Sequence, residues 1–222
     1  MEGPGQDADG DGNTQIGGDG VVAGRDITQI INQYQGMDEE QLRETIEKIL
    51  PELLVSKLSE MGIGSQSHAE GKELTSEEEG EVDEALEGAA AAEEAGIEFD
   101  PWEYITLGNA ARLRGRNFPA EGYYREAMRL FLEAGDREGE AQSINNLGNI
   151  AKDRGDLDEA ERLHRVSLAI NREVGNRVGE ATSLNNLGDL EEARGDHDVA
   201  SEYYEQAKGI CTELGLNEDD EE

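Results

Sequence analysis

Asparagine side chains recur along the second half of the chain at a fixed spacing. Three of them have a counterpart 40 residues further along: Asn109 with Asn149, Asn145 with Asn185, and Asn146 with Asn186. An asparagine amide carries both a hydrogen-bond donor and an acceptor. A row of such amides can therefore bond the backbone of an extended peptide, whatever the sequence of that peptide. The alternative is that these asparagines bond locally, to the backbone of their own helix.

Two basic residues follow the asparagines at the same spacing. Arg112 and Lys152 are 40 residues apart, and cations are scarce, because only 19 of the 222 residues are Lys or Arg. One repeat apart, the two side chains can hold an acidic side chain of a ligand through charge-assisted hydrogen bonds.

The sequence contains no recognisable catalytic group. Its three histidines, His68, His164 and His197, are neither paired with a nucleophile nor grouped at metal-ligand spacing. The single cysteine, Cys211, excludes an internal disulfide. We therefore expect no enzymatic activity, no cofactor and no catalytic metal.

One segment imitates a calcium-binding loop. Asp7, Asp9 and Asp11 are followed by Gly12, as at the start of such a loop, but Gly18 stands where a bidentate Glu belongs. No helical pattern flanks the segment, so we do not expect a calcium site.

The elements that carry the asparagines repeat with the same period. Glycines recur every 40 residues in three sets, of which Gly108, Gly148 and Gly188 form one, and Ala120, Ala160 and Ala200 form a fourth set. Self-similarity at this period predicts a helical solenoid, whose units bury their apolar faces by stacking on one another. Within each copy, helical spacing of apolar residues, a turn at a position such as Gly155, and a glycine such as Gly175 at the end predict two helices. The expected fold class is all-α.

The repeats resemble the tetratricopeptide repeat. They share its Leu-Gly pair early in the first helix, for example Leu147-Gly148, and its small residue where the helices cross, for example Ala160. The second copy departs with Ser167 at the second small site and with His164 where the others have tyrosine. The 40-residue unit is similar to the longer repeats of kinesin light chains and spindle-orientation adaptors.

The resemblance implies where a partner binds. In the family, the first helix of each pair lines a concave groove, and the matching positions here include Asn109, Arg112, Asn145, Asn146, Asn149, Lys152, Asn185 and Asn186. A clamp for a chaperone's C-terminal carboxylate is not expected, because the positions that hold its cations are Ile105, Asn109, Asn146, Thr182 and Asn186.

The chain is strongly acidic. Asp and Glu number 53 against 19 Lys and Arg, which gives a formal net charge of −34. Self-repulsion of this size strains a compact fold in dilute buffer and is screened at molar salt. The composition resembles that of cytoplasmic proteins of halophilic archaea; the alternative is an acidic protein with disordered ends. The charge argues against nucleic acid and anionic membranes as partners.

The first hundred residues divide into several pieces. A capping box at Asp38 and Gln41 opens an amphipathic helix that Pro51 should kink or split, and this helix either packs on its own domain or serves docking and oligomerisation; we favour docking. A second helix, Ser76 to Gly96, should cap the repeats with Val82, Ala85, Leu86, Ala89 and Ala90 on one side. The expected organisation is a Gly/Asp-rich flexible or β-prone segment at 1–36, the docking helix at 37–62, a linker at 63–75, a capping helix or half repeat at 76–100, repeats at 101–138, 139–178 and 179–216, and an acidic tail at 217–222.

These observations together predict a non-enzymatic, cytoplasmic adaptor. It would bind an extended peptide or partner segment in the groove of its repeats, with residues 37–62 as a route to a homo-oligomer. The rival hypothesis is a regulatory or sensor component of a prokaryotic signalling or defence assembly, whose N-terminus drives self-association. No apolar run approaches the roughly 20 residues that a membrane-spanning helix needs.

Overall fold

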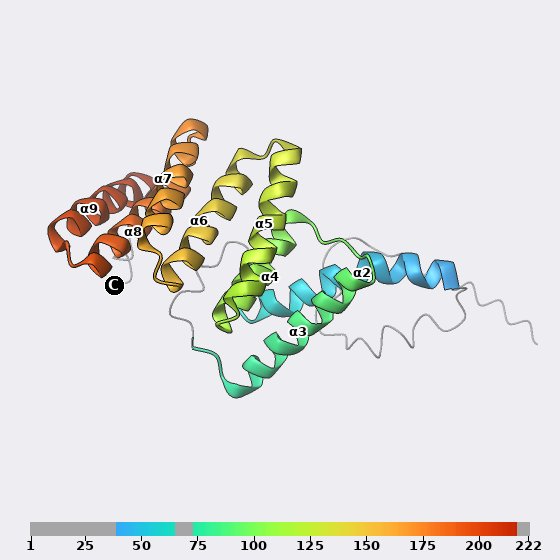
Figure 1. The fold of residues 1–222 in the computed structure, drawn as a ribbon. Helices are drawn as coiled ribbons and strands as arrows, with labels where there is room; N and C mark the ends of the chain where they lie inside the picture. The colour runs from blue at the N-terminus through green and yellow to red at the C-terminus, as the bar shows by residue number, and fades with distance from the viewer. Residues whose placement is uncertain (1–38, 65–72, 217–222) are drawn as a thin grey trace, which may run out of the picture.

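The computed structural model describes residues 39–64 and 73–216, and within these ranges the chain is built from helices without any strand (Figure 1). The all-α prediction is confirmed. The β-prone segment, the calcium-like loop from Asp7 to Gly12 and the acidic tail 217–222 fall outside the described residues. The helices are α2 (Glu39–Glu60), α3 (Ser76–Glu94), α4 (Pro101–Leu113), α5 (Asn117–Ala134), α6 (Arg137–Asp153), α7 (Leu157–Val174), α8 (Arg177–Arg194) and α9 (His197–Leu214).

The repeats form a succession of three helical hairpins, α4–α5, α6–α7 and α8–α9, each packed on the next (Figure 1). The first hairpin starts at Asp100, whose carboxylate accepts hydrogen bonds from the backbone nitrogens of Trp102 and Glu103. Glu103 reaches back to the backbone nitrogen of Asp100, so the predicted capping box is present. Left-handed glycines end the second helices, as at Gly135 with φ 72° and Gly175 with φ 75°.

The glycine of the Leu-Gly pair allows the two helices of a hairpin to cross closely. A Cβ on Gly108 would lie 2.4 Å from the ring of Tyr124, and one on Gly148 would lie 2.6 Å from the ring of His164. Any larger residue would push the second helix away from the first. This contact explains why the motif recurs with the repeat.

The helix α2 belongs in part to the core, which corrects the expected free docking helix. Leu54 and Leu58, in its second half, are buried in one apolar cluster with α3 and α4. The helix runs through Pro51 without splitting, and Ile63, in the expected linker, is fully buried. The packing partners of this half, α3 and α4, come later in the sequence. Self-association through residues 37–62 stays a prediction, carried by the exposed first half, where Ile46 is 37% exposed.

The helix α3 packs against the first repeat as a cap. Its buried face is Val82, Ala85, Leu86, Ala89 and Ala92. The first four were predicted, but Ala90 is exposed and Ala92 is buried in its place.

Arginines at the 40-residue period tie each first helix to the helix before it. Arg114 binds Asp83 and Glu79 of α3. Its counterpart Arg154 binds α5, and Arg194 binds α7. Towards the first repeat, α3 thus stands where the second helix of a preceding repeat would stand.

Candidate functional site

All eight predicted site residues lie on the first helices of the repeats, α4, α6 and α8. These helices contact one another in succession, α4 with α6 and α6 with α8. We call the surface of α4, α6 and α8 that carries these residues the inner face. The structure separates the residues by burial: Asn109, Asn145, Asn149 and Asn186 are buried, Asn146, Arg112 and Lys152 are partly exposed, and Asn185 is exposed.

Asn109 binds the backbone of a distant segment. Its amide nitrogen donates to the carbonyl oxygen of Gly64 at 2.8 Å, and its amide oxygen accepts from the Tyr124 hydroxyl at 2.8 Å. Gly64 follows the buried Ile63 in a stretch without regular secondary structure. An asparagine of a first helix thus bonds a segment of irregular backbone, and both the nitrogen and the oxygen of its amide have a partner.

Asn145 and Asn186 join the second repeat to the third. The Asn186 amide nitrogen donates to the Asn145 amide oxygen at 3.0 Å. The same oxygen lies 2.9 Å from Nδ1 of His164. Because a carbonyl oxygen only accepts, His164 is protonated at Nδ1. For these two asparagines, local bonding inside the solenoid is what the structure shows.

Asn146 is left without such a bond. Its amide nitrogen is buried and has no hydrogen-bond partner among the described residues. The physical reason lies in the preceding repeat. Asn186 bonds Asn145, but the position equivalent to Asn145 in the first repeat is Ile105, whose hydrocarbon side chain cannot accept a hydrogen bond from Asn146. The first boundary between repeats therefore carries an unmatched donor on the inner face.

Asn149 and His164 also keep unmatched atoms. In the first repeat, the equivalent Asn109 accepts from the hydroxyl of Tyr124. An imidazole is shorter than a phenol, and in this pair the Asn149 oxygen and His164 Nε2 are both buried without a partner in the described part of the chain. Burial, with the charge of Lys152 adding to it, lowers the pKa of His164 to about 3. The ring is neutral at physiological pH.

The two predicted cations are already paired with acids of the following repeat. Arg112 Nε lies 2.7 Å from Asp153, with a second bond at 3.2 Å, and Lys152 Nζ lies 2.9 Å from Asp189. Their charges are therefore matched within the chain, which leaves less attraction for an acidic ligand than the sequence suggested.

The third repeat reverses the charge at this position. Glu192 stands where Arg112 and Lys152 stand in the earlier repeats, and it accepts a hydrogen bond from Tyr204 at 3.1 Å. The inner face consequently becomes more acidic toward α8.

Sequence reasoning missed two groups of residues. The first is a buried polar cluster between the second and third repeats, formed by Ser167, Asn171 and Ser183. Only Ser167 drew notice, as a departure from the repeat pattern. The second is an exposed aromatic residue, Phe118, where the other repeats carry Asp158 and Asp198. Comparing the copies position by position would have found both.

Two further searches cover only the residues that the structure describes. None of their helices combines the length and the apolar character that crossing a membrane requires. No group of three or more His, Cys, Asp or Glu side chains in the same ranges is arranged to hold a metal ion.

Comparisons with known proteins agree with this architecture. The crystal structure of BtubC (BKLC) from P. vanneervenii is similar, with a TM-score of 0.51 and 24% sequence identity. The match covers 64% of this chain and 61% of that chain, so the chain spans less than two thirds of BtubC and the likeness concerns the fold alone. No curated protein matches the chain. The profile of the tetratricopeptide repeat matches residues 103–173 and 141–213, which together cover half of the 222 residues. With its hairpins and closely crossed Leu-Gly helices, the chain belongs to the tetratricopeptide repeat family.

Proposed function

We propose that the protein is a non-catalytic adaptor that binds an extended segment of a partner protein along its inner face. Tetratricopeptide repeats generally mediate protein–protein interaction. What is specific to this chain is the chemistry of the face, which offers amide groups in place of the cations that bind a terminal carboxylate.

The bond from Asn109 to Gly64 carries the proposal. In it, an asparagine of a first helix donates to a backbone carbonyl oxygen 45 residues away in the sequence, at 2.8 Å. This is the interaction that a bound peptide would make, provided here by the chain itself. Asn149 occupies the equivalent position on α6, and Asn146 lies close by with its unmatched donor. A partner backbone that continues along α6 would supply the acceptor that Ile105 cannot.

The charges of the inner face favour one kind of segment. Arg112 and Lys152 are neutralised by Asp153 and Asp189, whereas Glu192, at the same position of the third repeat, is an acid that accepts from the Tyr204 hydroxyl. A partner segment with neutral residues along α4 and α6 and a basic residue near α8 would fit this pattern. The net charge of −34 opposes nucleic acid and anionic membranes.

A random-peptide phage library, selected on the full chain, tests the proposal. We expect Asn146→Ala to lower the affinity for the selected peptides about two- to tenfold, because one hydrogen bond in a desolvated interface is lost. The fold should be retained, since alanine is the better helix former. Gln206→Ala is the matched control, because Gln206 is an exposed amide on α9 that bonds only its own helix, to the Glu202 carbonyl. Peptides that bind the Asn146 variant and the control equally well would place the binding surface elsewhere.

We also infer that the protein works in a salt-rich cytoplasm. Its acidic excess would weaken folding in dilute buffer through self-repulsion, and molar salt shortens the screening length to about 3 Å. Helical circular dichroism should therefore rise between about 10 mM and 3 M KCl. An unchanged spectrum over that range would remove the halophilic interpretation.

A further inference from the structure

Phe118, near the start of α5, is a large aromatic residue that the fold does not need. Its side chain is 85% exposed, whereas the repeat places aspartates, Asp158 and Asp198, at the equivalent positions. Burial therefore does not explain the phenylalanine. A large apolar group held in water at one copy of a repeated position indicates contact with another molecule.

Phe118 stands at the rim of an open cavity of about 750 Å³. The cavity lies between α5 and the connection from α3 to α4, and none of the eight inner-face residues lines it. Tyr104 and Tyr123 supply further aromatic surface, with ring centroids 6.1 Å apart, and Ile97 and Pro119 supply apolar surface.

The remaining wall of the cavity is mostly acidic, with four glutamates and one cation, Arg125, which forms an ion pair with Glu121. Glu121 and Glu126 have arginine partners, Arg154 and Arg129 respectively. Two other lining carboxylates, Glu93 and Glu98, form no ion pair within the described residues. In the part of the chain that the structure describes, these two carboxylates beside aromatic rings therefore have no cationic partner.

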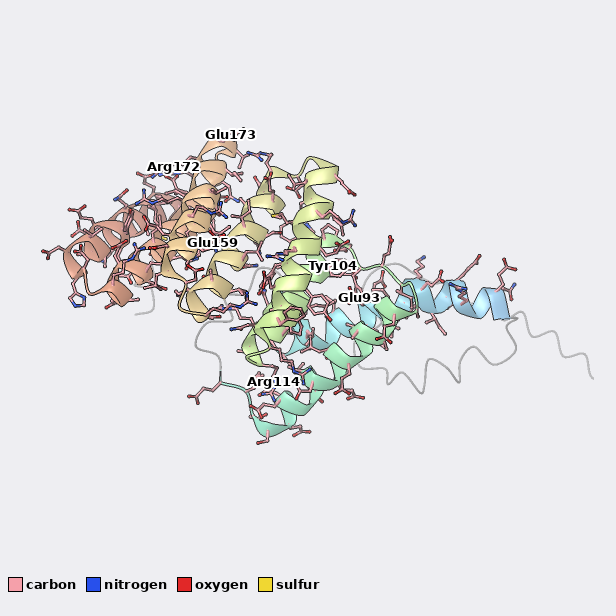
Figure 2. All side chains as sticks on the ribbon, viewed as in Figure 1. Glu93, Tyr104, Arg114, Glu159, Arg172 and Glu173 are labelled. Atoms are coloured by element: carbon pink, nitrogen blue, oxygen red, sulfur yellow. The ribbon has the colours of Figure 1, made fainter. Side chains whose placement is uncertain are left out.

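Glu93 is an exposed residue that lies beside an aromatic residue of the cavity. Figure 2 shows it at the end of α3, next to Tyr104 of α4. Burial raises the pKa of the Glu93 carboxyl, against the opposing hydrogen bond from Tyr104. A cation arriving there would meet a carboxylate and an aromatic ring together.

We infer that this cavity binds an arginine side chain presented by a partner protein. A guanidinium stacks on aromatic faces and bonds carboxylates with two parallel N–H groups, so it uses both features of the wall, whereas an ammonium uses mainly the charge. The acidic chain and the unmatched Glu93 and Glu98 provide the charge complementarity. The site is confined to the first repeat, because only there does the aromatic residue replace the aspartate.

The test titrates the full chain with N-acetyl-arginine amide and monitors the NMR signals of the tyrosine and phenylalanine rings. The salt concentration is about 0.15 M, at which charges more than about 8 Å apart are largely screened. N-acetyl-citrulline amide, which has nearly the same shape without the charge, is the comparison probe. We expect saturable shifts with the arginine derivative and much weaker ones with citrulline.

Three variants locate the effect. Phe118→Ser and Glu98→Gln should each weaken binding about two- to fivefold, and both change exposed residues, so the fold is kept. Asp198→Asn removes one carboxylate from the equivalent position of the third repeat and should leave binding unchanged. Three results would each overturn the arginine site: citrulline binds as well as arginine, the Asp198 variant loses as much affinity as the others, or spermidine binds equally well to the parent chain and to Phe118→Ser. Any of them would leave only a general attraction of cations to an acidic surface.

Discussion

The two halves of the solenoid are built on one repeat but filled with different chemistry. The cap and first repeat share a single apolar cluster that includes Phe99, Tyr104, Tyr124 and Phe131. Trp102 meets the Phe131 ring edge-on, with centroids 4.7 Å apart. From the second and third repeats, Ile150 is buried in this cluster and Leu147 packs against it. The other buried apolar residues of these two repeats fall mainly into two smaller groups, accompanied by buried serines and asparagines.

One position shows the difference most directly. Phe131 and Asn171 are equivalent residues at the ends of α5 and α7, and each packs against a glycine of the next helix, Gly139 or Gly179. The phenylalanine fills its site with hydrocarbon. The asparagine bonds Ser167 and Ser183 at 3.3 and 3.4 Å, distances typical of weak hydrogen bonds. The repeat thus fixes the backbone path and leaves the filling of the interface free, so stability should vary along the solenoid.

The largest expected effect compares these two positions. Phe131→Ala should lower the free energy of unfolding by about 3–5 kcal/mol, because it removes a buried ring. Asn171→Ala should lower it by only about 1 kcal/mol. The hydroxyls of Ser167 and Ser183 keep their bonds to the carbonyls of Ala141 and Gly179. Urea unfolding measures both variants, by circular dichroism for the whole chain and by fluorescence of Trp102, the single tryptophan, for the first repeat.

The two signals also test whether the halves differ in stability. If the polar half opens first, circular dichroism changes at lower urea than the fluorescence, and Asn171→Ala widens the gap. Coincident transitions, together with equal losses in the two variants, would show that the polar interface is as stable as the aromatic one.

The fold was predictable from the sequence because it follows from a periodic pattern. The Leu-Gly pairs, the capping box at Asp100 and the terminal glycines act locally, and each is repeated or self-contained. The place of α2 was not predictable in this way. Leu54 and Leu58 show only that one side is apolar, and nothing in their spacing says that the partner is α3 and not another chain.

The site was predictable only in outline. The eight residues do lie on three neighbouring helices, but their partners depend on contacts between repeats. Asn145 and Asn146 are adjacent in sequence, yet one is bonded by Asn186 and the other faces Ile105. Arg112 and Lys152 were predicted to bind a ligand because their partners are not visible in the sequence. The acids that bind them, Asp153 and Asp189, lie in the following repeat, at separations of 41 and 37 residues.

The smallest expected effect concerns the histidine that replaces a tyrosine in the polar half. His164→Tyr should bring a hydroxyl to the unmatched Asn149 oxygen, as Tyr124 and Tyr204 do for Asn109 and Asp189. Replacing His164 also loses the Nδ1 bond to Asn145, so at neutral pH we expect the tyrosine variant to be about 1 kcal/mol more stable than His164→Phe, which loses the same bond. His164→Phe is the matched control, because it has a similar ring but cannot form the bond.

Acid pH should raise the stability of both variants relative to the parent chain, and the sign follows from the pKa of His164. Burial lowers the pKa of His164 to about 3 in the folded chain, so the fold favours the neutral ring. The unfolded chain takes up the proton near about pH 6.5. The stability that depends on the neutral ring is therefore complete above that pH and declines as the pH falls toward 3, by about 1.4 kcal/mol per pH unit. Neither the tyrosine nor the phenylalanine variant titrates there, so both should gain on the parent chain in urea unfolding at pH 5.5 relative to pH 7.5. Parallel losses in all three chains would mean that the imidazole is hydrated and not part of the core, and the polar half would then be looser than the contacts of Asn145 indicate.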